Sequence, residues 1–109
     1  MNVQWRQGSA VGAASLPAGV VRLSEARRGD RGVVLAVSPD AMTGADSEER
    51  EELERRLLEI GFVEGARIEL LHEGFIGRDP IAVRLDDMRV ALRRREAQGV
   101  IITLDGAAG

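Results

Sequence analysis

The hydrophobic and polar positions change their period once within one short stretch, residues 53–71. Leu53, Leu57 and Ile60 recur at the spacing of one face of an α-helix, and Leu58 is expected to widen that face. Beyond this helix, apolar and polar residues alternate with a period of two, which is typical of a half-buried strand. The stretch therefore predicts a helix that leads into a strand and covers one face or end of a small sheet.

Both ends of this helix carry recognisable signals. Asp46 is a good N-cap, and Glu49 stands three residues later, where its carboxylate can complete a capping box. Gly61 follows the last apolar residue, where the chain needs a left-handed conformation that glycine adopts freely. Gly65 allows a second turn before the strand begins. The helix is therefore predicted over residues 47–60, with its acidic first turns exposed to solvent.

Strand patterns occur in five places. One is a short continuous apolar run, typical of a buried strand, and the others lie at or near a period of two. The predicted strands are Gly32–Val37, Arg67–His72, Ile81–Leu85, Met88–Leu92 and Val100–Leu104. Arg93–Gln98 is short, polar and closed by a glycine, which predicts a single 3-10 turn before the last strand.

These elements predict a mainly β protein. The expected architecture is a small SH3-like barrel of five strands, with one α-helix after the first strand and the 3-10 turn before the last, because closure removes exposed sheet edges. A five-stranded OB-like barrel is the alternative, although its helix normally lies between the third and fourth strands. We expect residues 20–104 to form the barrel, residues 1–19 a flexible extension and residues 105–109 a frayed end.

Composition narrows the classes of function. The chain has 109 residues, and all fifteen of its basic residues are arginine. Its net charge is -3, so the molecule as a whole has no positive electrostatic field that would attract nucleic acid. There is no cysteine, which excludes a disulfide, a thiolate nucleophile and a cysteine-based zinc site. No segment approaches the roughly 18 apolar residues of a membrane span. We expect a cytoplasmic protein without direct membrane insertion.

Candidate chemistry is sparse. His72 is the single histidine and has no second histidine or cysteine with which to bind a transition metal. Asp86 and Asp87 are adjacent on a predicted turn, which explains them better than acid–base catalysis does. No phosphate-binding glycine loop of the P-loop type occurs. We expect no enzyme activity, no cofactor and no tight metal site, and the sequence leaves weak metal affinity open.

Three segments together resemble the ferrous iron transport protein A (FeoA) family. They are LSEARRGDRGVVLAV, LERRLLEIGFVEGARIELL and GRDPIAVRLDDMRVALRRREAQGVII, within residues 22–104. The likeness lies in the glycine-containing turn after the helix, the G-D-P hairpin and the L-R-x-x-E-A close. The chain departs from the pattern in its N-terminal extension, in the longer acidic loop Ser38–Asp46, and in Arg78, which stands between Gly77 and Asp79.

The resemblance implies a small cytosolic SH3-like protein. Members of the family work with, or are fused to, a large membrane ferrous-iron transporter that carries an N-terminal GTP-binding domain. A similar domain lies at the C-terminus of some metal-dependent repressors. The expected partner is therefore the cytosolic region of an inner-membrane ferrous-iron transporter, which would hold the chain at the membrane periphery. A free-standing nucleic-acid-binding barrel and a detached repressor-type domain are the alternatives, and the oligomeric state is open.

One surface is a candidate for binding this partner. Phe75 and Ile76 are predicted at a loop tip, where an apolar pair either folds back over the barrel or waits for a partner. Arg84, Met88 and Arg93 are predicted on strands nearby, with Arg84 pointing outward. Apolar anchors beside arginines are the composition that dominates interface energetics. We expect these five residues to form one recognition face.

Overall fold

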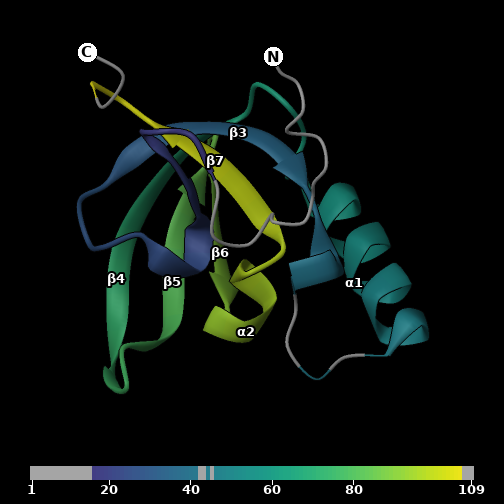
Figure 1. Ribbon diagram of the computed structural model, residues 1–109. Helices are drawn as coiled ribbons and strands as arrows, with labels where there is room; N and C mark the ends of the chain where they lie inside the picture. Colours follow the sequence, from purple (N-terminus) through teal and green to yellow (C-terminus); the bar gives the residue numbers. More distant parts are fainter. Residues whose placement is uncertain (1–15, 42–43, 45, 107–109) are drawn as a thin grey trace.

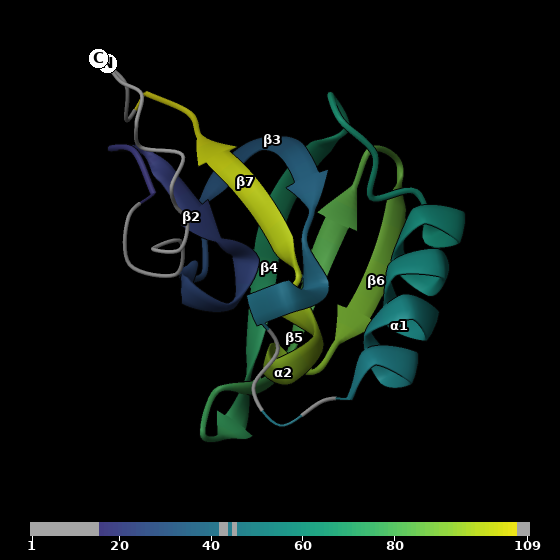
Figure 2. The same ribbon diagram turned by 45° about the vertical axis from the view of Figure 1, so that its right-hand side comes forward.

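The computed structural model describes residues 16–41, 44 and 46–106, and its centre is one strongly curved antiparallel sheet (Figures 1 and 2). The sheet has six strands in the order β2–β7–β3–β4–β5–β6. The strands are β2 (Val20–Arg22), β3 (Arg31–Val37), β4 (Arg67–Ile76), β5 (Asp79–Leu85), β6 (Met88–Leu92) and β7 (Val100–Leu104). The helical elements are η2 (Leu23–Glu25), η3 (Pro39–Ala41), α1 (Ser47–Ile60) and α2 (Arg94–Ala97).

The predicted mainly β class is confirmed, but the strand count of five was wrong. The additional strand, β2, has three residues and pairs with β7 from Val20 opposite Thr103 to Arg22 opposite Ile101. Three residues are too few to show a period of two, so this strand depends on a pairing that is remote in sequence. Consequently α1 follows the second strand of the described chain, and the predicted 3-10 turn before β7 is the four-residue α-helix α2.

The sheet is open rather than closed into a barrel. β2 and β6 are its two edge strands, and no backbone pairing joins them among the described residues. In Figure 2, helix α1 stands beside β6, at the side where a closed barrel would continue. A helix that covers the edge of a sheet is one of the ways in which proteins protect it from aggregation.

The residues of α1 explain how it reaches this position. Asp46 accepts a hydrogen bond from the Glu49 N–H at 2.8 Å, and Glu49 accepts one from the Asp46 N–H at 3.2 Å, which forms the predicted capping box. Leu53 and Leu57 are buried. Leu58, however, is 43% exposed, so the expectation that it widens the apolar face was wrong. One residue advances the helix by about 100°, which carries Leu58 beyond the buried face.

Two glycines turn the chain from α1 into β4. Gly61 has a φ of 128°, and its N–H donates to the carbonyls of Leu57 at 3.2 Å and Leu58 at 3.1 Å. Gly65 has a φ of 94°, and its N–H donates to the Val34 carbonyl at 2.8 Å. Both conformations favour glycine. They bring the end of α1 and the start of β4 against β3.

The core lies between the concave side of the sheet and α1. Among the described residues it is aliphatic apart from Phe62, which is completely buried. Ile60 is half-buried and packs against the same cluster. The largest buried side chains are Phe62, Leu23, Leu57, Leu70, Ile81, Leu85, Ile102, Val34, Val83 and Val100.

β4 is four residues longer than predicted. It was expected to end at His72, but it continues to Ile76, with irregular pairing between Leu70 and His72 and between Glu73 and Ile76. Such bulges interrupt the alternation of apolar and polar side chains, which is why the sequence pattern indicated a loop. The turn itself is only Gly77 and Arg78, both with positive φ. Phe75 and Ile76 therefore belong to a β-hairpin rather than to a loose connection.

The ends of the ordered fold differ from the expected boundaries. Gly19 lies in the predicted flexible extension, yet its carbonyl accepts a hydrogen bond from the Leu104 N–H at 2.8 Å. Asp105 lies in the predicted frayed end, yet its N–H donates to the Arg31 carbonyl at 2.8 Å. The rest of these two predicted segments, residues 1–15 and 107–109, lies outside the described residues.

The packing of α1 is directly testable. Leu57→Ala removes a side chain with 0% exposure and should lower the free energy of unfolding by about 2–5 kcal/mol. Leu58→Ala, one residue further along the same helix, should change it by no more than about 0.5 kcal/mol. Chemical denaturation of both variants measures the difference. Equal losses would mean that α1 is rotated from the position described here.

Candidate protein-docking site

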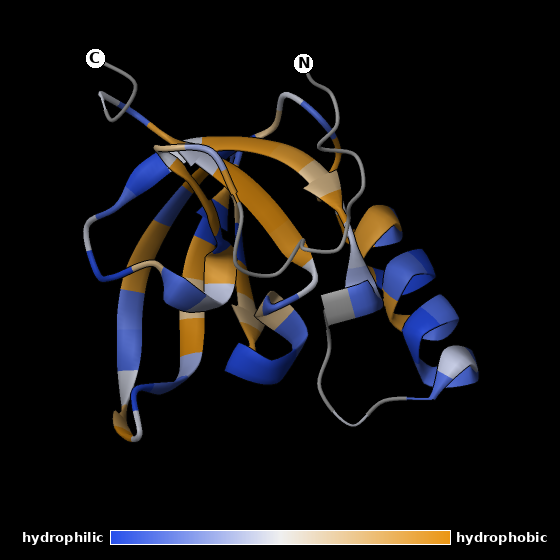
Figure 3. Ribbon diagram, viewed as in Figure 1, coloured by the Kyte–Doolittle hydropathy of each residue, from blue (hydrophilic) through white to orange (hydrophobic). Residues whose placement is uncertain are grey.

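The end of the β4–β5 hairpin carries the most exposed apolar side chains in the described chain. Phe75 is 105% exposed and Ile76 is 87% exposed. In Figure 3 they form an orange end on the hairpin, with hydrophilic residues on the strands next to it. Of the two alternatives that the sequence left open, the structure shows the one in which the pair points away from the fold. We call Phe75 and Ile76 the hairpin tip.

The hairpin tip stands on a tightly packed base. Gly74 lies so close to β5 that a Cβ atom there would be 2.1 Å from the carbonyl oxygen of Asp79, so only glycine fits. Glu73 accepts a hydrogen bond from the Arg28 N–H at 2.8 Å and lies 3.8 Å from the Arg78 guanidinium. These contacts tie the base of the hairpin to the turn that precedes β3.

Arg94 joins the same base to α2. Its backbone N–H donates to Asp79 Oδ1 at 2.8 Å, and its Nε donates to the Arg78 carbonyl at 2.7 Å. Its Nη1 donates to the Ser24 carbonyl at 2.5 Å, and its Nη2 lies 3.7 Å from Glu73 Oε2. The sequence analysis missed this residue, because a middle arginine in a run of three has no pattern that marks it as largely buried.

The strand register divides the predicted recognition face into two parts. Ile76 pairs with Asp79 at one end of β5, and Arg93 follows Leu92, which pairs with Ile81 near that same end. Met88 pairs with Leu85 at the other end. Because β5 has seven residues, the two ends are about 20 Å apart.

The residues at the far end have surroundings of their own. Arg84 is exposed, as predicted from the alternation, but its Nη1 lies 2.7 Å from Glu69 Oε1 on β4. Met88 is 46% exposed and lies close to Gly61 at the end of α1. The structure thus brings Phe75, Ile76 and Arg93 together and leaves Arg84 and Met88 apart from them.

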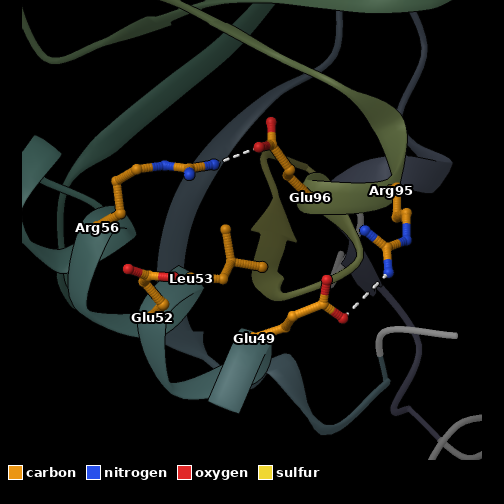
Figure 4. Close-up of a pocket in the computed structure, with 6 residues that line it drawn as sticks. All are labelled: Glu49, Glu52, Leu53, Arg56, Arg95 and Glu96. Carbon is orange, nitrogen blue, oxygen red and sulfur yellow. Dashed lines mark hydrogen bonds and ion pairs between the residues drawn. The ribbon is translucent and has the colours of Figure 1, made fainter. Parts of the chain in front are cut away.

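A polar hollow of about 160 Å³ separates α1 from α2 (Figure 4). Leu53 lies within it, between two ion pairs that join the helices, Arg56 with Glu96 and Arg95 with Glu49. Glu96 also accepts a hydrogen bond from the Arg93 N–H at 3.0 Å. These charged side chains pair with one another, so the two ion pairs connect α1 to α2 and leave few free charges for a ligand.

The described residues hold no metal-ligating or membrane-spanning arrangement. No group of three or more histidine, aspartate or glutamate side chains converges there, and His72 is exposed on β4. Asp86 lies on the β5–β6 turn, where its Oδ1 accepts the Arg67 N–H at 3.0 Å. None of the helices in the described ranges has the length and apolarity needed to cross a membrane.

Comparison with known proteins adds independent information. A family model described as the FeoA domain matches residues 21–104. A Porphyromonas gingivalis protein named as a fusion of Fe(2+) transport protein A with the Fe(2+) transporter FeoB is 34% identical over 84 residues. The match covers 77% of this chain but only 9% of the fusion protein.

Two solved structures share the fold. The FeoA protein of Chlorobium tepidum is 32% identical with a TM-score of 0.60, over 79% of this chain and 71% of that one. The FeoA of Stenotrophomonas maltophilia, solved in complex with zinc, is 31% identical with a TM-score of 0.58, over 80% of this chain and 92% of that one. It is described as an SH3 domain protein, and this likeness confirms the predicted SH3-like class.

Metal binding by this chain provides a test of the chemical prediction. With one exposed histidine and no cysteine, the chain should not bind Zn²⁺ or Fe²⁺ stoichiometrically with a dissociation constant below about 1 μM. Anaerobic calorimetry of the wild-type chain and of His72→Ala measures this. Tight binding that disappears in His72→Ala would overturn the prediction.

Proposed function

Because the chain belongs to the FeoA domain family, we propose that it is a non-enzymatic accessory protein of ferrous iron uptake. It docks on the cytosolic region of an inner-membrane ferrous-iron transporter and modulates it. In this proposal the chain is cytoplasmic and reaches the membrane periphery only through the transporter. It requires no cofactor, in keeping with a sequence that has no phosphate-binding loop and no catalytic constellation.

The observation that carries the proposal is the fusion relative. In that protein, a segment 34% identical to this chain is named together with a ferrous-iron transporter in one polypeptide. A covalent link holds two modules at an effective concentration that reaches about millimolar for short flexible linkers. A separate chain needs an interface of its own to reach the same partner.

The hairpin tip is the best candidate for that interface. Exposed apolar side chains in a well-ordered element are typical anchors of protein interfaces. Arg93 lies at the same end of the sheet, is exposed, and has no ion-pair partner among the described residues. An arginine beside an apolar anchor can pair bidentately with a carboxylate of the partner.

Substitution at the hairpin tip tests this function. Phe75→Ala should weaken binding to the transporter's purified cytosolic region by about 1–3 kcal/mol, roughly fivefold to 150-fold. Met88→Ala, an exposed apolar residue at the far end of the β5–β6 hairpin, should leave the affinity within about twofold. Calorimetry or biolayer interferometry at physiological salt gives both affinities.

Two results would count against this account. If the wild-type chain does not bind the transporter region, the proposed function fails. If the chain instead binds oligonucleotides with an affinity that falls steeply with salt, the nucleic-acid alternative takes its place. A loss in Met88→Ala equal to that in Phe75→Ala would move the docking surface away from the tip.

A further inference from the structure

We infer that the hairpin tip acts as a rigid prong that enters an enclosed apolar socket of a protein partner, and that Arg94 fixes its direction. The inference rests on the proposed function, since the partner is taken to be the transporter's cytosolic region. It adds the kind of surface that receives the tip and a positioning residue outside that surface.

The first argument concerns the exposure of the tip. Phe75 and Ile76 are the last two residues of β4, in a stretch where the pairing with β5 is irregular. They are 105% and 87% exposed, so almost none of either side chain is covered by the fold. A flat partner surface covers such side chains from one direction only. An occupant that buries both completely must surround the tip.

The second argument favours a protein over a lipid surface. The hairpin tip and the first turn of α1 lie at the same end of the molecule in both views (Figures 1 and 2). The N-cap Asp46 and the first two turns carry exposed carboxylates, among them Glu48 and Glu51. Anionic lipid headgroups would attract Arg78 and Arg93 at the tip but repel these carboxylates, so a uniformly anionic surface does not match this end of the molecule. A protein socket has no such uniform charge.

The charges near the tip indicate which charges the edge of the socket should carry. The acids at its base are already engaged, Glu73 by Arg28 and the arginines beside it, and Asp79 by the Arg94 N–H. Arg93 and Arg78 remain exposed, and among the described residues the Arg78 guanidinium has only the 3.8 Å contact with Glu73. The complementary partner surface is an apolar socket with carboxylates at its edge.

The third argument concerns the stiffness of the prong. The Arg94 side chain is only 20% exposed and donates hydrogen bonds both to the Arg78 carbonyl in the hairpin turn and to the Ser24 carbonyl in η2. It thereby links the hairpin turn to η2 and to its own helix, α2. A prong that is ordered before binding loses less conformational entropy when it enters the socket.

Lysine cannot reproduce these bonds. The guanidinium presents donors in several fixed directions, whereas a lysine ammonium is one compact point of charge. Arg94→Lys therefore keeps the charge and removes the fork that spans two carbonyls. Arg95→Lys is a matched control, because Arg95 is an exposed neighbour whose one ion pair, to Glu49, is long at 3.9 Å.

The experiment combines binding with a measurement of tip motion. In the free protein, Arg94→Lys should lower the ¹⁵N order parameters of the 74–77 amides from about 0.85 toward 0.6, and Arg95→Lys should not. Arg94→Lys should also weaken binding to the transporter's cytosolic region about tenfold. Phe75→Ala and Ile76→Ala should each weaken it, because an enclosing socket contacts both side chains.

A double-mutant cycle separates positioning from a general loss of structure. If Arg94 acts through the tip, Arg94→Lys should change affinity by less than about twofold in a chain that already carries Phe75→Ala and Ile76→Ala. If Arg94→Lys weakens binding equally in the wild-type chain and in the Phe75→Ala, Ile76→Ala chain, the positioning role is overturned. Order parameters that stay unchanged in the free Arg94→Lys protein would also overturn it. Should Arg94→Lys fail to fold, Arg94→Met replaces it in both measurements.

Two further outcomes address the socket itself. If only one of Phe75→Ala and Ile76→Ala weakens binding, the partner surface is flat and the socket is rejected. Co-sedimentation with phosphatidylglycerol–phosphatidylethanolamine vesicles that depends on Phe75 would identify a lipid surface instead. If the wild-type chain does not bind the transporter region, the proposed function is rejected. If the wild-type chain binds and substitutions at the tip and at Arg94 do not change the affinity, only this inference is rejected.

Discussion

The structure depends on the burial of one aliphatic core between an open, curved sheet and a single helix. A domain of this size has little apolar surface to bury, so each contact of α1 with the sheet counts. Leu57 is completely buried, and Phe62 follows it into the core directly after the glycine turn. The sheet does not close on itself, so α1 completes the wall around the core. Two ion pairs on the protein surface connect α1 to α2.

This constraint explains why the hairpin tip can be so exposed. The inward side chains of β5, Ile81, Val83 and Leu85, anchor the hairpin in the core. The hairpin then continues beyond the core, where none of the helices that the structure describes covers its end (Figure 1). An apolar pair at such a position adds nothing to folding and carries a risk of aggregation. The proposed role in recognition accounts for its presence.

The sequence predicted the features that local patterns specify. The apolar residues of α1 recur with a clear helical period, and Asp46 and Glu49 form a capping box of known chemistry. The start and the end of this helix were therefore predicted correctly. β2 was not found, because its three residues acquire strand structure only by pairing with β7. The end of β4 was not found, because bulges near Leu71 and Gly74 break its alternation.

The candidate site was predictable only in part, for a similar reason. The composition at Phe75 and Ile76 pointed to an unusual apolar turn, and the structure shows both side chains exposed. That Arg84 and Met88 lie at the opposite end follows from strand register, which a local pattern does not reveal. The brace formed by Arg94 depends on carbonyls of Ser24 and Arg78, which are distant in sequence and leave no local signal.

We propose that this chain meets the transporter with the end of its β4–β5 hairpin. Amide chemical-shift mapping of the ¹⁵N-labelled chain, titrated with the transporter's cytosolic region, is the direct test. The largest changes should fall on residues 74–79 and on Arg93 and Arg94, with little change from Arg84 to Arg89. Changes concentrated on Arg84–Arg89 or on the exposed face of α1, with the hairpin tip unaffected, would contradict it.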